Sequence, residues 1–139
     1  MSHGSCCLGN AVYVICGAVF SKKEKRLKRI GSVERLDLSS AEARWESIVI
    51  PDVCGRGHLG VAPVSSTQIV ILGGFSALGG KFTNKHWLFD TESHHVSEAA
   101  SNKTKAIAPW QQATMQVSPG IVLTIDYKTE KLMQYSHDQ

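Results

Sequence analysis

The sequence is poor in the residues and patterns that mark disordered or membrane proteins. Only four of its 139 residues are proline and 42% are hydrophobic, which argues against wholesale disorder. No apolar run approaches the roughly 20 residues that a membrane-spanning helix needs, and no stretch carries the apolar stripe of an amphipathic helix. Basic residues follow the apolar segment 11–20, whereas a secretory signal has them before it. We therefore expect one globular domain without a membrane span.

Patterns typical of catalytic or metal sites are also missing. The four cysteines show no C-x-x-C spacing, so the sequence gives no basis for a zinc site or a disulfide framework. No Ser/His/Asp or Cys/His constellation is evident. The segment 73–81 has Phe75 where a phosphate-binding loop needs its first glycine, and Phe82 rather than Ser or Thr follows Lys81. We expect no catalytic residue, no metal and no cofactor. Cysteines without a disulfide pattern favour a reducing, cytoplasmic location.

The sequence does contain a repeated phrase. Residues 11–17 form a Val- and Ile-rich run that stops at a glycine, and residues 68–74 repeat it. A second short strand pattern follows each run and ends at Asp37 or Asp90. The glycines recur after 57 residues and the aspartates after 53. A period near 50 residues that is built from strands indicates propeller blades rather than a helical solenoid.

The two runs predict strands, because Val and Ile suit a pleated sheet and continuous apolarity is typical of a strand buried on both faces. Glycine at the end of such a strand lets the backbone turn where a Cβ would clash or would need a strained φ, and we expect this at Gly73 or Gly74. Residues 18–31 are expected to form a long loop. Further strands are expected at 5–8, 32–38, 44–50, 86–90, 94–99, 110–117, 120–125 and 131–136.

Taken in order, these features resemble the kelch repeat, in which a glycine doublet ends one strand, an aromatic-Asp pair ends another, and a tryptophan follows about eight residues later. The second run has the full doublet, the first has Cys16-Gly17, and Trp45 lies eight residues after Asp37. The second unit has Val96 near the tryptophan position, and a third, weaker unit at 121–127 has Asp-Tyr in place of the doublet. The resemblance makes six residues structural: Gly17, Asp37, Trp45, Gly73, Gly74 and Asp90.

The resemblance implies an all-β fold, a partial β-propeller of antiparallel four-stranded blades in one domain over 1–139. The first blade spans 5–51, the second 55–100, and part of a third 110–136. Closed propellers have about 4–8 blades, so two and a half blades leave apolar sheet surface in water. We expect a portion of a larger propeller that associates with the chains or segments completing it. Trp45, at the end of a blade, is expected to pack between neighbouring sheets.

The resemblance also implies a function, because kelch-type propellers are usually scaffolds or adaptors that hold protein partners. Loops held on a rigid frame commonly carry such binding. We expect a non-catalytic protein–protein interaction module. The alternative is a kelch-like enzyme of the oxidase or sugar-isomerase type, which would need Cys, Tyr and His ligands converging on the channel, such as Cys16, Tyr13, Tyr127 and His58.

One dense run of charge, at 22–29, stands out in a chain whose net charge is only +3. It could contact an acidic protein or nucleic acid, act as a nuclear address, or be a solvated loop. Aromatic residues are not interleaved with it, which argues against nucleic acid. Arg56 and His58 resemble the arginine that opens the next repeat and could face the channel. The candidate partner-binding residues are Lys22, Lys23, Lys25, Arg26, Lys28, Arg29, Arg56 and His58.

Overall fold

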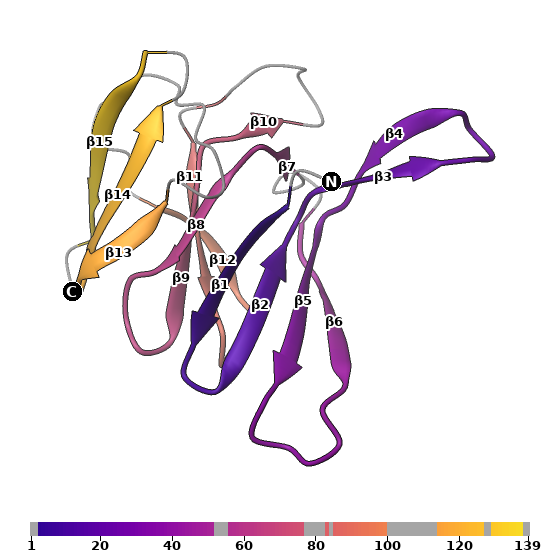
Figure 1. Ribbon diagram of the computed structural model, residues 1–139, viewed down its shortest axis with the longest axis horizontal. Helices are drawn as coiled ribbons and strands as arrows, with labels where there is room; N and C mark the ends of the chain where they lie inside the picture. The colour runs from indigo at the N-terminus through magenta and orange to yellow at the C-terminus, as the bar shows by residue number, and fades with distance from the viewer. Residues whose placement is uncertain are drawn as a thin grey trace.

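The computed structural model describes residues 3–51, 56–76, 83, 85–99, 114–126 and 129–137, and their regular structure is β throughout (Figure 1). The all-β class expected from the sequence is therefore confirmed. Within these ranges there is no helix that could cross a lipid bilayer. The strands of the same ranges form separate open sheets rather than one closed sheet.

Three sheets make up the body. Each is an antiparallel meander, in which the strands lie side by side in the order in which they occur in the chain. Turns at Gly9-Asn10, at 65–67 and at 119–120 connect neighbouring strands of these sheets. The first sheet holds β1 (Gly4–Leu8), β2 (Ala11–Ile15), β5 (Ser32–Asp37) and β6 (Trp45–Val49). The second holds β8 (Gly60–Pro63), β9 (Gln68–Leu72), β11 (His86–Asp90) and β12 (Val96–Ala99). The third holds β13 (Met115–Ser118), β14 (Ile121–Asp126) and β15 (Lys131–Ser136).

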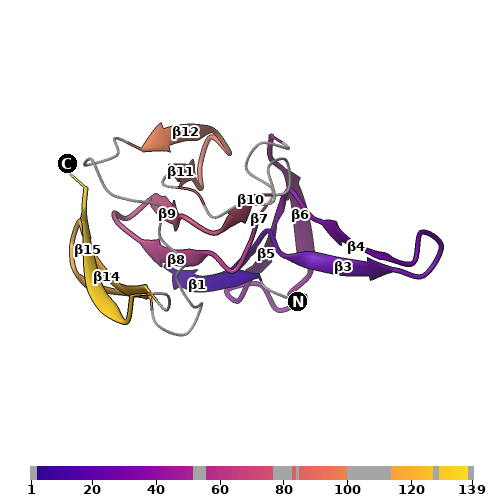
Figure 2. The same cartoon turned by 90° about the horizontal axis from the view of Figure 1, so that it is seen from above.

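Two small two-stranded sheets complete the described structure, and the second of them is a hairpin. β7 (Arg56–Gly57) pairs with β10 (Phe75–Ser76) beside the second sheet. β3 (Ala18–Ser21) pairs with β4 (Arg26–Arg29), so the expectation of a long loop over 18–31 is wrong. The hairpin extends away from the body (Figure 2). Most of its described side chains are exposed, so its strands do not need the alternation of apolar residues by which a strand is recognised in a sequence.

The three sheets pack face against face. β1 lies against β8 and β8 against β13, so the first strands of the three sheets are neighbours. The close approach is visible at Gly4, where a Cβ would overlap the side chain of Val61. At the other junction, the Gly120 N–H donates to the Val64 carbonyl at 2.9 Å. The sheets therefore form a row with the first and third at its ends.

Each sheet has a front face, which points toward the next sheet along the chain, and a back face, which points toward the previous one. One core joins the front of the first sheet to the back of the second and contains Tyr13, Ile15, Val33, Ile69, Ile71 and Phe89. The other core joins the front of the second to the back of the third and contains Val70, Leu72 and Val122, with Met133 and Tyr135 against it. Because side chains alternate along a strand, β9 serves both cores at once.

Trp45 does not pack between sheets, contrary to the expectation. It lies on β6, the edge strand of the first sheet, and pairs with Leu36 on the back face. No described sheet covers this face, and 55% of Trp45 is exposed.

Candidate functional site

The two glycine pairs set where the loops leave the body. Gly73 and Gly74 have φ of 51° and 89°, and Cys16 and Gly17 have φ of 54° and 112°. The expectation of positive φ at the doublet is therefore confirmed. A Cβ on Gly74 would lie 3.0 Å from the Gly57 carbonyl oxygen, because β7 runs directly against it.

The same hydrogen bond closes the segment that leaves each pair. The Ile30 N–H donates to the Gly17 carbonyl, and the Thr83 N–H donates to the Gly74 carbonyl, both at 3.1 Å. The β3–β4 hairpin is thus the first repeat's form of the segment that follows the doublet in the second.

The β3–β4 hairpin is anchored at its base and closed at its tip. Ala18 is buried at the base. At the tip, the Glu24 N–H donates to Ser21 Oγ at 3.1 Å, and Lys25 has φ 51°. Arg26 Nε donates to Glu24 Oε2 at 2.7 Å, and this hydrogen bond, with the charge of Arg26, lowers the pKa of Glu24. Such an exposed pair contributes little stability, so it fixes the turn rather than the fold.

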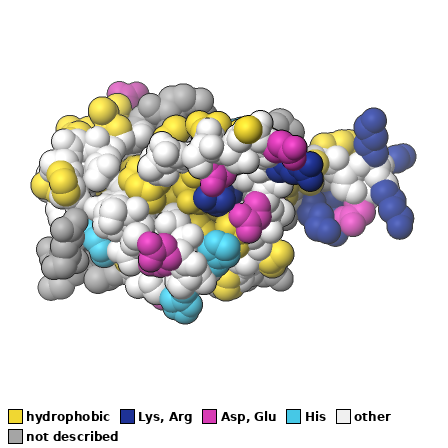
Figure 3. Space-filling view, turned by 90° about the horizontal axis from the view of Figure 1, so that it is seen from below, with side chains coloured by type: hydrophobic (Ala, Val, Ile, Leu, Met, Phe, Trp, Pro, Cys, Tyr) yellow, Lys and Arg dark blue, Asp and Glu magenta, His cyan; other side chains and the backbone are white. Residues whose placement is uncertain are grey.

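Charge is concentrated on this hairpin. Residues 18–31 hold six of the chain's 15 Lys and Arg residues but one of its 12 Asp and Glu residues, which leaves nine basic and eleven acidic residues elsewhere. The segment is therefore net +5 and the remainder net −2. Figure 3 shows the basic side chains gathered where the hairpin extends beyond the body. The exposed cations with described side chains are Lys22, Lys23, Lys25, Arg26 and Lys28.

Apolar side chains accompany these cations. Val19 and Phe20, on β3, are 49% and 53% exposed. Lys28 pairs with Val19 across the hairpin, so that a cation and an apolar side chain share one face. A surface that combines cations with adjacent apolar area suits a protein partner better than a surface of cations alone, because burial of the apolar area adds to the attraction between charges.

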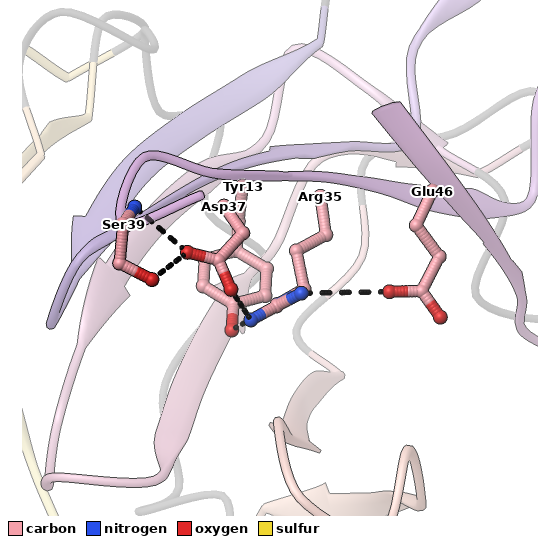
Figure 4. A network of polar contacts seen from close by, with 5 residues as sticks. All are labelled: Tyr13, Arg35, Asp37, Ser39 and Glu46. Carbon is pink, nitrogen blue, oxygen red and sulfur yellow. Dashed lines mark hydrogen bonds and ion pairs between the residues drawn. The ribbon is translucent and has the colours of Figure 1, made fainter. Parts of the chain in front are cut away.

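A polar network spans the front face of the first sheet (Figure 4). Arg35 on β5 faces Tyr13 on β2 and Glu46 on β6 across the strands. Arg35 Nε donates to Tyr13 Oη at 3.4 Å, and the guanidinium contacts Asp37 Oδ2 at 3.1 Å and Glu46 Oε2 at 3.6 Å. The hydrogen bond with Tyr13, followed by that with Asp37, raises the pKa of Arg35. The network therefore holds a permanent cation and stabilises the sheet.

Tyr13 also links this network to the second sheet. Its ring meets the edge of Phe89 with centroids 6.4 Å apart. Tyr13 is buried and Phe89 is fully buried, so the contact lies within the first core. Sequence reasoning missed the network because it depends on strand register, which places Tyr13, Arg35 and Glu46 opposite one another.

The two repeat aspartates close equivalent turns. Asp37 Oδ1 accepts hydrogen bonds from the Ser39 hydroxyl at 2.6 Å and from the Ser39 N–H at 2.9 Å. Asp90 Oδ1 accepts hydrogen bonds from the Ser93 N–H and hydroxyl, both at 2.8 Å, and from the Glu92 N–H at 3.1 Å. These bonds lower the pKa of both carboxyl groups. Their role is to fix turns.

The remaining candidates lie outside the hairpin. Arg56 is on β7, and His58, partly buried with φ 53°, follows it before β8. Tyr127, considered for the enzyme alternative, lies outside the described residues, whereas Tyr13 and Cys16 are buried in the first core. No group of three His, Cys, Asp or Glu side chains in the described ranges could hold a metal ion.

No family model matches the chain, and no curated protein matches its sequence. Solved structures do match, 134 chains in all. One of them, titled "Structure of YjhT", superimposes with a TM-score of 0.65 over 98% of this chain at 11% sequence identity. The match covers 41% of that chain, so the present sequence spans less than half the length of the solved structure it resembles. At this identity the likeness concerns the fold alone.

Proposed function

We propose that this chain is a portion of a kelch-type β-propeller and acts as a non-catalytic module that binds an acidic protein surface through the β3–β4 hairpin. The observation that carries the proposal is the projecting hairpin, net +5 on a remainder that is net −2. Such charge separation attracts an acidic partner and orients its approach.

The propeller assignment is supported by the repetition itself. The first and second sheets share strand order, the positive-φ pair and the capped aspartate. Their first strands lie side by side with that of the third sheet, as blades require. Likeness to 41% of a longer solved chain is what a portion of a larger repeat assembly would give. A cytoplasmic location is part of the proposal and is favoured by cysteines without a disulfide pattern.

The binding surface combines the hairpin cations with Val19 and Phe20. An acidic peptide that carries one or two apolar side chains could pair with the cations and cover this apolar area. Arg56 and His58, close to β10 through the β7–β10 pairing, are a second, smaller candidate contact.

The test measures fluorescence anisotropy of a labelled Glu-rich peptide and of a single-stranded DNA of equal charge. Replacing Lys22, Lys23 and Lys25 by Gln should weaken peptide binding roughly tenfold. Replacing Arg44, Lys85 and Lys131 by Gln removes the same charge from the body and should change binding little. Phe20→Ser should weaken binding to a peptide that carries a leucine more than to one that does not.

Two results would contradict the proposal. Equal weakening by both triple variants would mean that net charge, and not the hairpin, governs binding. Tighter binding of the DNA than of the peptide at equal salt would move the partner from protein to nucleic acid, whose affinity falls steeply with salt.

A further inference from the structure

The row of sheets ends in two faces that no sheet of the described residues covers. One is the back face of the first sheet, where Trp45 is 55% and Val49 is 85% exposed. The other is the front face of the third sheet, where Met115 is 61%, Ile125 is 43% and Leu132 is 65% exposed. Monomeric proteins rarely leave apolar sheet faces open, so each face calls for a partner.

The back face of the first sheet is built like one that is buried elsewhere in this chain. Aligning the glycine pairs places Val12 and Val14 of β2 at the positions of Ile69 and Ile71 of β9. Ile69 and Ile71 are fully buried against the first sheet, whereas Val12 and Val14 are only partly buried. The exposed positions therefore have the apolar character of a packed interface.

The front face of the third sheet repeats the same logic. The alignment places Leu123 and Ile125 of β14 at the positions of Val70 and Leu72 of β9, which are fully buried against the third sheet. Leu132 lies opposite Ile125 on β15 and extends the apolar surface. The two free faces are thus one front and one back, and both sheet-to-sheet cores among the described strands join a front to a back.

The back face of the first sheet also has room for the side chains of a covering sheet. The back face of the first sheet has two adjoining hollows of about 190 and 250 Å³, both lined by Val14 and Glu34, and Trp45 lines the second. The Glu34 carboxylate accepts hydrogen bonds from the Ser32 and Ser47 hydroxyls at 3.0 and 2.8 Å, so covering it would not leave it unpaired.

We propose that a second copy of this chain docks front to back on both free faces, so that two copies close a ring of six sheets. The proposal rests on the propeller arrangement proposed above, and six lies within the usual 4–8 blades. The second copy is the occupant because the chain itself carries the complement of each face. A two-fold axis then repeats one heterologous contact twice and leaves no free face.

The test uses the full chain and light scattering after size exclusion over a wide range of concentration. Wild-type protein should have twice the mass of the chain. Trp45→Arg and Leu132→Glu each alter one free face at a side chain that is more than half exposed, and each should be a folded species of single-chain mass. An equimolar mixture should recover the doubled mass, because one interface pairs the new cation with the new anion and the other is unaltered.

Two control variants alter the hairpin and leave both free faces unchanged. Val19→Glu alters an exposed apolar residue of the hairpin and should leave the doubled mass intact, as should the Lys22, Lys23, Lys25 triple variant. A circular dichroism melt establishes folding, and Trp45→Gln with Leu132→Gln replace any variant that fails to fold. A wild-type monomer, open-ended polymers, or a dimer sensitive to only one face would each overturn the proposal. Peptide binding by the hairpin reports on the proposed function independently of this mass.

Discussion

Cys16 and Gly73 share one backbone conformation, with φ of 54° and 51°, at the same place in two successive repeats. Each follows a buried strand and precedes a glycine that is also at positive φ. The left-handed conformation costs a residue with a Cβ about 1–2 kcal/mol, whereas glycine adopts it freely. The first repeat therefore has the positive φ of the doublet with a cysteine in place of one glycine, at the expense of local strain.

This strain predicts an inverted order of stability at Cys16. Cys16→Ala keeps the Cβ and removes the sulfur, whereas Cys16→Gly also relieves the strain. In an ordinary strand Gly would be less stable than Ala by about 0.5–1 kcal/mol. Here we expect Cys16→Gly to be more stable than Cys16→Ala by about 1 kcal/mol in urea denaturation. The usual order would show that Cys16 is not strained.

The second doublet is predicted to be less tolerant than an open turn. Gly74 and Gly9 both have positive φ, but a Cβ on Gly74 would press on the Gly57 carbonyl, whereas one on Gly9 would meet nothing within 4 Å. Gly9→Ala should cost about 1 kcal/mol from its backbone alone. Gly74→Ala should cost at least about 1 kcal/mol more, since β7 must also shift. Equal losses in chemical denaturation would contradict the close approach.

The turn aspartates predict how stability depends on pH. Hydrogen bonds from the N–H and hydroxyl of Ser93 lower the pKa of Asp90 from its ordinary value near 3.8. The stability that they contribute is therefore fully present above pH 3.8 and is lost as pH falls toward the lower, folded-state pKa. The free energy of unfolding is measured in urea at neutral pH and at pH 3. At neutral pH, Asp90→Asn should be less stable than the wild type, because it has already lost part of this contribution. Its further loss at pH 3 should be smaller than that of the wild type.

Trp45 and Phe89 should differ strongly when each is replaced by alanine. Phe89 is fully buried between two sheets, and its removal should cost about 3–5 kcal/mol. Trp45 lies on a free face, so in a Leu132→Glu background, which keeps the chain single, Trp45→Ala should cost less than about 1 kcal/mol. A large loss in that background would mean that Trp45 packs within its own chain.

The sequence predicted the three meanders from the Val- and Ile-rich strand at the centre of each, and β9 shows this pattern most fully because both of its faces are buried. Ile69 and Ile71 face one core while Val70 and Leu72 face the other, and such a run reads as continuously apolar. The positive φ at Gly73 and Gly74 could also be predicted from the sequence, since glycine alone adopts it without strain and leaves room for β7.

Other features lay beyond the sequence. The β3–β4 hairpin projects into water, so burial leaves no pattern in residues 18–29. Trp45 was expected to be buried between two sheets, because the blades of a closed ring cover one another. A local sequence pattern does not specify whether the covering sheet belongs to the same chain. The contact of Arg35 with Tyr13 and Glu46 required the register of three strands, which no local pattern specifies.

Cysteine reactivity gives a last prediction, in a Cys54→Ser background that leaves only cysteines with described positions. Burial, followed by the neighbouring Cys7, raises the pKa of Cys6 to about 12, so its thiol stays protonated and unreactive at pH 8. Cys7 is exposed and pairs with Val12 on the back face of the first sheet. In the Leu132→Glu variant, Cys7 should therefore react with a thiol reagent well before Cys6 and the buried Cys16. In the wild type, a second copy over this face should slow the labelling of Cys7, and mass spectrometry of the labelled peptides separates the sites. Faster reaction of Cys6 than of Cys7 in the single-chain variant would contradict the placement of β1, because alternation along this strand puts the two thiols on opposite faces.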